Sequence, residues 1–208
     1  MFEEILSSQA INIIESLSPH LDTFYLAGGT GLALQLGHRR SHDLDFFSDR
    51  IFNPDSILTR ISADKVFFTE LGTVHCELKK IRISFLYYNV PLIQPPLLWR
   101  GIKIAHYKDI VAEKVKTISQ RGSKKDFIDL YAILKLKGSI KEVCEQFKNR
   151  FTTLDINYYH VLKSLIFFED AEQEPSPLML LSGEDWKWEK IKAFFLNNIG
   201  LFEHELGL

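Results

Sequence analysis

The sequence predicts an α+β fold, in which a mixed sheet with flanking helices is followed by a helical carboxyl-terminal lobe. In residues 1–100, short segments rich in β-branched and aromatic residues alternate with amphipathic helical segments. The segment VPLIQPPLLWRG at 90–101 contains three prolines, which interrupt regular structure. After it, nearly every segment has helical periodicity. We therefore expect two lobes, residues 1–100 and residues 101–208.

The first lobe is expected to begin with an amphipathic helix over residues 2–17 and a strand over 23–27. Gly28 and Gly29 break this strand, Thr30 is the expected N-cap of a short helix, and Gly37 closes that helix. The other expected elements are a strand at 43–47, a helix opened by Asn53-Pro54-Asp55, and three strands at 66–70, 74–79 and 81–88. The last two strands are expected to form a hairpin.

The second lobe is expected to consist of helices, because apolar residues recur there at helical spacing. The expected helices cover residues 107–120, 124–136, 139–149, 155–171 and 186–205. The aromatic residues of the last helix are expected to form core, although they also leave open a purely structural or interaction domain; they are Trp186, Trp188, Phe194 and Phe195.

Composition excludes several classes of protein. With 208 residues, 46% of them hydrophobic and 25% charged, the chain can bury a full core. A net charge of −2 argues against the basic field of a protein that coats nucleic acid, so any contact with a polyanion must be local. Cys76 and Cys144 lack metal-ligand spacing and indicate a reduced, cytoplasmic compartment. The amino terminus does not have the pattern of a signal peptide, and no run is long enough to span a membrane.

Two aspartates in the segment SHDLDFF are the strongest candidate metal ligands. Asp43 and Asp45 are two residues apart on an expected strand, so both carboxylates project from one face while Leu44 and Phe46 face the other. Mg²⁺ prefers one or two carboxylates together with substrate phosphates and water. The alternative interpretation is a solvated end of a strand.

The glycine turn before these aspartates can approach a phosphate closely, at the positive end of a helix dipole. Together, the segment FYLAGGTGLALQLGHRRSHDLDFF resembles the nucleotidyltransferase superfamily related to DNA polymerase beta, and within it the AbiEii/AbiGii-type abortive-infection toxins. The resemblance implies that Gly28, Gly29 and Thr30 grip a triphosphate and that Asp43 and Asp45 bind magnesium.

The resemblance extends to GIKIAHYKDIVAEKVKTISQRGSKKDFIDLYAIL, and so covers about residues 20–136. It implies that Lys114 approaches the triphosphate and that Asp126 and Asp129 belong to a second functional cluster. Arg121 lies seven residues after Lys114, on the same expected helix face, in a basic run suited to phosphate or RNA contact.

The residues themselves allow other interpretations of this second block. Ser123 and Asp126 fit a capping box at the start of a helix. Asp126 and Asp129 share a helix face and could be an exposed acidic pair, and Lys114 could be merely solvated.

The loop between the glycine turn and the carboxylates carries His38, Arg39, Arg40 and His42. Arg39 or Arg40 is expected to stabilise the triphosphate or to orient Asp43, with a loop salt bridge as the alternative. A zinc site built on His38 and His42 is disfavoured, because the pair follows Gly37 in a loop rather than lying on a helix.

A third carboxylate, usual in enzymes related to polymerase beta, is not evident. The candidate strand IRISFLYY places Arg82, Ser84 and Leu86 on its polar face and contains no acid. Glu77, on the preceding strand, is the nearest substitute, although an ordinary edge-strand charge is the simpler role. Loss of a catalytic carboxylate would leave binding largely intact and reduce turnover, because base catalysis contributes on the order of 100- to 10,000-fold.

The preferred hypothesis is an enzyme dependent on Mg²⁺ (or Mn²⁺) that moves a nucleoside monophosphate from a nucleoside triphosphate to a hydroxyl of RNA, such as tRNA, or of protein. The resemblance implies a toxin controlled by a cognate antitoxin. The alternative is a nucleotide- or RNA-binding module that keeps the scaffold without transfer.

Overall fold

The computed structural model describes all residues from Met1 to Leu208. The chain divides into two compact units. The sheet unit comprises residues 1–35 and 40–106, and the helical unit comprises residues 36–39 and 107–208. The sequence placed the boundary near residue 100, whereas the contacts divide the chain after His106 and assign the short segment 36–39 to the helical unit.

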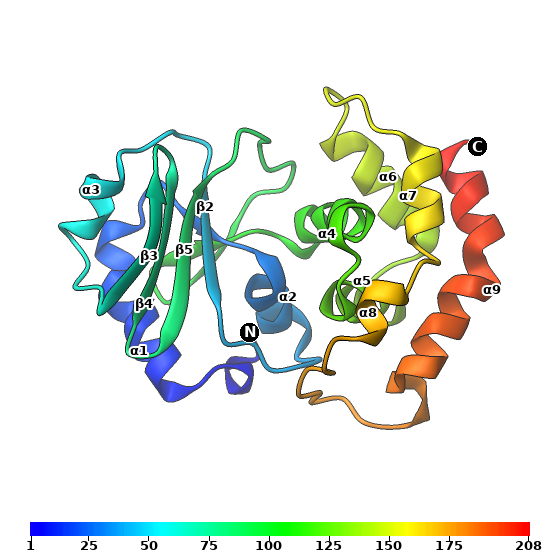
Figure 1. Ribbon diagram of the computed structural model, residues 1–208, viewed down its shortest axis with the longest axis horizontal. Helices are drawn as coiled ribbons and strands as arrows, with labels where there is room; N and C mark the ends of the chain where they lie inside the picture. Colours follow the sequence, from blue (N-terminus) through cyan, green and yellow to red (C-terminus); the bar gives the residue numbers. More distant parts are fainter. The chain divides into compact units, whose positions relative to one another are not determined.

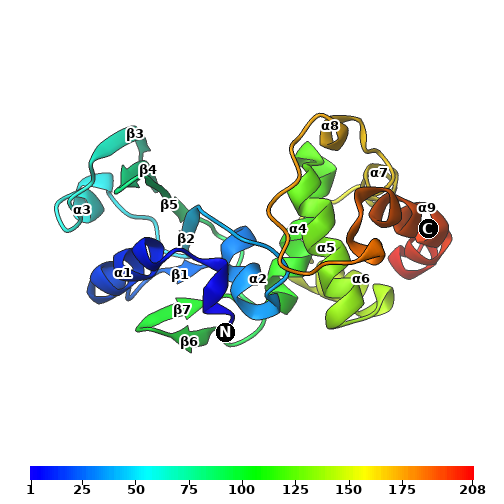
Figure 2. The same ribbon diagram turned by 90° about the horizontal axis from the view of Figure 1, so that it is seen from below.

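The sheet unit is built on one seven-stranded sheet in the order β3-β4-β5-β2-β1-β7-β6 (Figures 1 and 2). The β2–β5 and β1–β7 pairs are parallel, and the other pairs are antiparallel, which confirms the expected mixed sheet. The strands are β1 (Tyr25–Leu26), β2 (Leu44–Ser48), β3 (Lys65–Glu70), β4 (Thr73–Leu78), β5 (Ile81–Tyr87), β6 (Leu97–Trp99) and β7 (Ile102–Ile104).

The predicted hairpin is the β4–β5 pair, and its turn has positive φ at Lys79 and Lys80, 48° and 64°. A second hairpin, β6–β7, was not predicted. Its strands have three residues each, too few to show alternation. Arg100 and Gly101 turn this hairpin with φ of 46° and 78°.

Helices cover both faces of the sheet. The unit contains the 3₁₀ helices η1 (Glu3–Ile5) and η2 (Ser18–His20) and the α-helices α1 (Ser8–Leu17), α2 (Gly28–Leu36) and α3 (Pro54–Leu58). Figure 2 shows α1 against one face of the strands around β2 and α2 against the other. The buried side chains of α1 follow helical spacing and are Ala10, Ile13, Ile14 and Leu17.

Two predicted helix starts in this unit are wrong. Ser7 caps α1 by accepting a hydrogen bond from the amide of Ala10, so the helix begins at Ser8 and residues 3–5 form a separate 3₁₀ turn. Thr30 is not an N-cap, because α2 already begins at Gly28 and the amide of Gly31 donates to the carbonyl of Ala27 (3.0 Å).

The helical unit follows the predicted helices closely. It contains α4 (Tyr107–Arg121), α5 (Lys124–Leu136), α6 (Ile140–Arg150), α7 (Tyr158–Ser164), α8 (Glu169–Glu172), η3 (Glu184–Trp186) and α9 (Trp188–Leu206). The single helix predicted at 155–171 is wrong, because it is divided into α7 and α8. Between them, Phe168 turns into the core, with its ring centroid 5.0 Å from that of Phe127 and 5.8 Å from that of Trp188.

The segment 36–39 is fixed within the helical unit. Arg39 forms an isolated β-bridge with Met179, and the amide of Leu180 donates to the carbonyl of His38 (2.9 Å). Of the four aromatic residues predicted to form core near the last helix, Phe195 of α9 is fully buried, whereas Trp186, Trp188 and Phe194 are half-buried. No helix has the length and apolar character that crossing a membrane requires.

Candidate functional site

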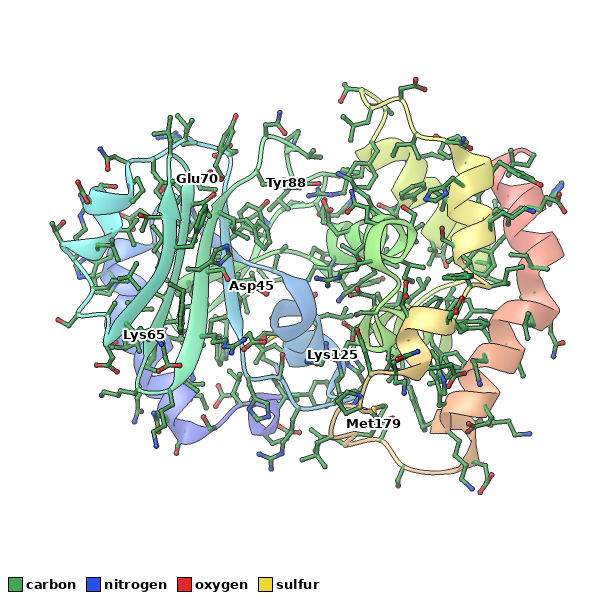
Figure 3. The ribbon with its side chains drawn as sticks, in the orientation of Figure 1. Asp45, Lys65, Glu70, Tyr88, Lys125 and Met179 are labelled. Carbon is green, nitrogen blue, oxygen red and sulfur yellow. The ribbon has the colours of Figure 1, made fainter.

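The carboxylates of Asp43 and Asp45 lie at the same cavity of the sheet unit. Asp45 is in β2 and Asp43 immediately precedes it, while Leu44 and Phe46 between and after them are fully buried. This is the alternation that the sequence predicted. Figure 3 labels Asp45 on its strand of the sheet. Both aspartates thus line the space that a ligand in the cavity would occupy.

The cavity has a volume of about 470 Å³, large enough for a nucleotide-sized ligand. It combines acidic, basic, hydroxyl and aromatic groups. Its lining residues are Asp43, Asp45, Phe67, Phe68, His75, Cys76, Arg82, Ile83 and Ser84.

The glycine turn lies directly beside Asp45. Gly28 has a φ of 61°, and a Cβ atom added to it would lie 3.2 Å from Oδ2 of Asp45. The amide of Ala27 also donates to the carbonyl of Asp45 (3.0 Å). The left-handed backbone conformation favours glycine here, and a Cβ atom would also crowd the carboxylate. The start of α2 is therefore positioned at the metal-ligand candidates.

Thr30 fixes this arrangement from inside the protein. Its side chain is buried, and its hydroxyl donates to the backbone carbonyl of Asp43 and is hydrogen-bonded to Oγ of Ser41 (2.6 Å). The side chain therefore ties the first turn of α2 to the residue that opens β2. The phosphate contact predicted for the Gly28-Gly29-Thr30 turn rests on its backbone groups.

The strand next to β2 carries a hydroxyl where a third carboxylate was sought. In the parallel β2–β5 ladder, Asp45 is in register with Ser84, and Ser84 is in register with His75 of β4. Nδ1 of His75 is 3.1 Å from Oγ of Ser84. Glu77, the predicted substitute, is opposite Arg82 in the β4–β5 ladder and does not line the cavity.

A β-bulge brings two consecutive aromatic residues to the cavity. The register between β3 and β4 shifts between Val66 and Phe68, so that Phe67 is the extra residue. Phe67 and Phe68 are 47% and 48% exposed and both line the cavity. Sequence reasoning missed them, because a regular strand would have sent them to opposite faces.

The other predicted site residues form an ion-pair network in the helical unit. Nζ of Lys114 is 2.7 Å from Oδ1 of Asp126 and 2.6 Å from Oδ2 of Asp129. Arg121 pairs with Oδ2 of Asp126 at 2.9 Å. Arg39 binds Asp129 through Nε at 2.7 Å and through a second guanidinium nitrogen at 2.8 Å. The network thus unites five predicted residues.

Burial and charge oppose each other in this network. Burial disfavours the charged form of Asp129, but Arg39 and Lys114 outweigh it and hold the pKa of Asp129 well below its usual range. The pKa of Asp126 is lowered for the same reason by Lys114 and Arg121. Conversely, the two carboxylates outweigh the effect of burial on Lys114 and raise its pKa. All three groups are therefore charged at neutral pH.

These contacts decide several alternatives. Asp126 and Asp129 are fully buried and Lys114 is 6% exposed, so an exposed acidic pair and a solvated lysine are both wrong. Ser123 is the N-cap of α5, but its side chain makes no capping hydrogen bond and donates instead to Oδ2 of Asp126 (3.0 Å). His38 contacts Asp129 through Nε2 at 2.7 Å. No group of three or more histidine, cysteine, aspartate or glutamate side chains that could hold a metal ion is present.

Comparison with known proteins decides the family. A family model described as the nucleotidyl transferase AbiEii toxin of a Type IV toxin-antitoxin system matches residues 12–94. The uncharacterized protein aq_aa25 of Aquifex aeolicus (strain VF5) is 35% identical over 184 residues, which cover 85% of this chain and 86% of that protein. The chain belongs to the AbiEii nucleotidyltransferase toxin family.

Solved structures confirm the fold of this AbiEii protein. JHP933 from Helicobacter pylori superposes with a TM-score of 0.50 at 18% identity and covers 96% of both chains. A second structure, a candidate nucleotidyltransferase from H. pylori, has a TM-score of 0.51 at 18% identity and covers 95% of this chain and 98% of its own. The nucleotidyltransferase-like α+β fold predicted from the sequence is thus confirmed.

Proposed function

We propose that this AbiEii protein is a magnesium-dependent enzyme that transfers a nucleoside monophosphate from a nucleoside triphosphate to a hydroxyl of RNA or protein and releases pyrophosphate. The observation that carries the proposal is that two aspartates, a cavity and the start of a helix lie close together in the sheet unit. Asp43 and Asp45 line the cavity, and Gly28 at the start of α2 abuts the carboxylate of Asp45. This is the arrangement that phosphate and a divalent ion need together.

The donor set fits Mg²⁺, or Mn²⁺, better than a metal held by protein ligands alone. Asp43 and Asp45 supply hard oxygen atoms at a cavity with no third acid. Mg²⁺ commonly uses one or two carboxylates and completes its coordination with substrate phosphates and water. When bound, such an ion neutralises charge that develops on the phosphates during transfer.

Backbone N–H groups and a basic side chain supply the other contacts that phosphate binding needs. The first N–H groups of α2, from Gly28 onward, carry the positive end of the helix dipole and lie at Asp45. Arg82 lines the same cavity and supplies a guanidinium suited to phosphate. With these groups, catalysis consists of positioning and charge neutralisation, without a covalent intermediate on the protein.

Roles at the nucleotide for Lys114, Arg39, Arg121, Asp126 and Asp129 remain predictions from the sequence. The ion pairs among these residues also support a structural role in the helical unit, because each buried charge is compensated there. We include Lys114 among the catalytic residues on the resemblance alone.

The toxin role follows from family membership and is part of the proposal. The matching family is described as the toxin of a Type IV toxin-antitoxin system, which supports control by a cognate antitoxin. The acceptor is proposed as an RNA hydroxyl, with tRNA one candidate, or a protein hydroxyl.

A binding module without transfer is the second candidate function. One observation favours it: Ser84, rather than an acid, stands beside Asp45 on β5. Such a protein would bind a magnesium nucleotide in the same cavity and leave the triphosphate intact.

Incorporation of label from α-labelled triphosphates into total RNA and total protein, with magnesium or with a chelator, tests the proposal. We expect magnesium-dependent incorporation by the native protein and a loss of at least about 100-fold in Asp45→Asn. Asp49→Asn, an exposed aspartate just past β2 and outside the cavity lining, is the matched control and should keep full activity. Nucleotide binding without incorporation would establish the second candidate, and incorporation unchanged in Asp45→Asn would refute the site.

A further inference from the structure

We propose that His75 is the proton acceptor of the transfer reaction and that Ser84 is its positioning residue. This inference rests on the proposed function and concerns the same cavity. It assigns to a histidine on β4 the task that related enzymes give to a carboxylate on the strand beside the metal ligands. Three observations carry it: the register of the strands, the contacts of the imidazole and the composition of the cavity.

The register places the three polar residues in one row across the sheet. Asp45 of β2, Ser84 of β5 and His75 of β4 are consecutive partners in the two ladders. Neighbouring strands are roughly 4.8 Å apart, so the backbone positions of Asp45 and His75 are separated by roughly 10 Å. That separation accommodates a phosphorus atom and an attacking hydroxyl between the metal-ligand candidates and the imidazole. Asp45, Ser84 and His75 all line the cavity.

The imidazole is held on two sides. Nδ1 of His75 is 3.1 Å from Oγ of Ser84. On the other side, the ring of Phe68 lies against it, with ring centroids 6.1 Å apart and planes tilted by 36°. When Nδ1 donates its proton to Ser84, Nε2 is the unprotonated nitrogen and can accept a proton. A hydrogen bond that selects the tautomer and orients the ring is the usual preparation of a histidine base.

No other group in the cavity is suited to the task. Asp43 and Asp45 are assigned to the metal ion, and Arg82 is a cation that cannot accept a proton. Cys76 is buried, and burial raises the pKa of its thiol to about 11, so it is neither a thiolate nor exposed to the acceptor. Ser84 is not a base by itself. The imidazole of His75 is the remaining group of the cavity with a ring nitrogen that can accept a proton.

In the proposed step, the acceptor oxygen attacks the α-phosphorus of the triphosphate and forms the new P–O bond. The bond between that phosphorus and the bridging oxygen breaks, and pyrophosphate leaves with the electron pair. The proton of the acceptor hydroxyl moves to Nε2 of His75. The resulting imidazolium, still donating through Nδ1 to Ser84, then releases the proton to water.

Charged groups around His75 define what a pH profile reports. Asp43, Asp45 and Arg82 share its cavity. Glu77 follows on the same face of β4 and has Lys65 of β3 and Arg82 of β5 in register beside it. Among these side chains, only an imidazole ordinarily titrates between pH 5 and 8, so an acid limb of the rate in this range is expected to depend on His75.

The test compares His75→Gln, Ser84→Ala and the control His20→Gln, which lies in η2 outside the cavity lining. We expect His75→Gln to lower kcat by about 100-fold or more, with the Kd for magnesium–ATP unchanged and the acid limb lost. Ser84→Ala should lower kcat less and retain an acid limb, and His20→Gln should behave as the native protein. Added imidazole should restore part of the transfer by His75→Ala, which excludes a merely structural loss.

The inference is overturned if His75→Gln keeps its native rate or acid limb, if nucleotide affinity falls in parallel with rate, or if imidazole does not rescue His75→Ala. These outcomes leave the proposed function standing, because the native protein still transfers. A native protein that binds magnesium–ATP without transfer would instead overturn both, and the two failures are therefore distinguishable.

Discussion

The pair Asp43 and Asp45 differs from the pair Asp126 and Asp129 in burial and in charge compensation, although both pairs are close in sequence. The first pair lines an open cavity of about 470 Å³. The second is fully buried, and each of its carboxylates is within hydrogen-bonding distance of basic side chains of its own unit. A carboxylate whose charge is compensated by buried basic side chains contributes to the stability of the fold, whereas one that faces a cavity can bind a ligand.

The largest stability effect is expected at Asp129. Asp129→Asn removes the charge that compensates Arg39 and Lys114 in a buried environment, so the free energy of unfolding should fall by about 3–5 kcal/mol. Denaturant unfolding followed by tryptophan fluorescence would measure this change, since two of the three tryptophans, Trp186 and Trp188, lie in the helical unit. Asp45→Asn, at the cavity, should change the same quantity by less than about 0.5 kcal/mol. Equal losses in the two variants would end the distinction between the pairs.

Acid should weaken the helical unit through the same network. The folded-state pKa of Asp126 and of Asp129 is lowered, so their contribution to stability is fully present above the ordinary aspartate pKa of about 3.9. It is lost progressively as pH falls below about 4 toward the lowered values, because the unfolded state then binds protons more readily. Melting temperatures between pH 6 and pH 3 should fall steeply in the native protein and less steeply in Asp129→Asn.

An intermediate effect is expected at the glycine turn. Gly28→Ala places a side chain at a φ of 61° and a Cβ atom 3.2 Å from Oδ2 of Asp45. The left-handed conformation alone costs about 1–2 kcal/mol, and displacement of the carboxylate should also weaken binding of magnesium–ATP. Gly200→Ala in α9 is the control, since an added Cβ meets nothing within 4 Å there. If Gly28→Ala binds the nucleotide as well as Gly200→Ala, the turn does not form part of the site.

The smallest effect is expected at the surface of the network. Arg121 pairs with Asp126, but its side chain is 64% exposed. Arg121→Gln should therefore lower the free energy of unfolding by only about 0.2–1 kcal/mol. Measuring nucleotide affinity in the same variant sharpens the comparison: an increase in Kd would give Arg121 the phosphate role predicted from the sequence, and an unchanged Kd would leave it a structural partner of Asp126.

The sequence was sufficient to predict those features of the fold that depend on neighbouring residues along the chain. Alternation along one strand put Asp43 and Asp45 on the face opposite Leu44 and Phe46, and the structure has them so. The helices α4, α5, α6 and α9 were predicted within two residues at each end, since their apolar periodicity is strong. The mixed sheet was also predicted, although not the order of its strands.

The sequence was insufficient to predict contacts between segments that are far apart along the chain. Strand β5, the parallel partner of β2, begins 37 residues after the start of β2. The pairing of Asp45 with Ser84 therefore depends on a register that no local pattern encodes. Burial of Asp129 likewise depends on Arg39, 90 residues away, packing against α5. The bulge at Phe67 has no signature in composition either, and it decides which aromatic side chains reach the cavity.

Strand β3 forms the outer wall of the cavity and is paired on one side only, with all six of its residues exposed (Figure 1). Its backbone amides should exchange with solvent hydrogen sooner than those of β2 and β5, which are paired on both sides. The cavity thus has an inner wall on strands paired on both sides, which carries Asp45 and Ser84, and an outer wall on the edge strand, which carries Phe67 and Phe68 and is expected to be less stable locally. We expect local opening of this outer wall to admit acceptors of different widths to the proposed site, while the spacing of Asp45 and Ser84 stays fixed.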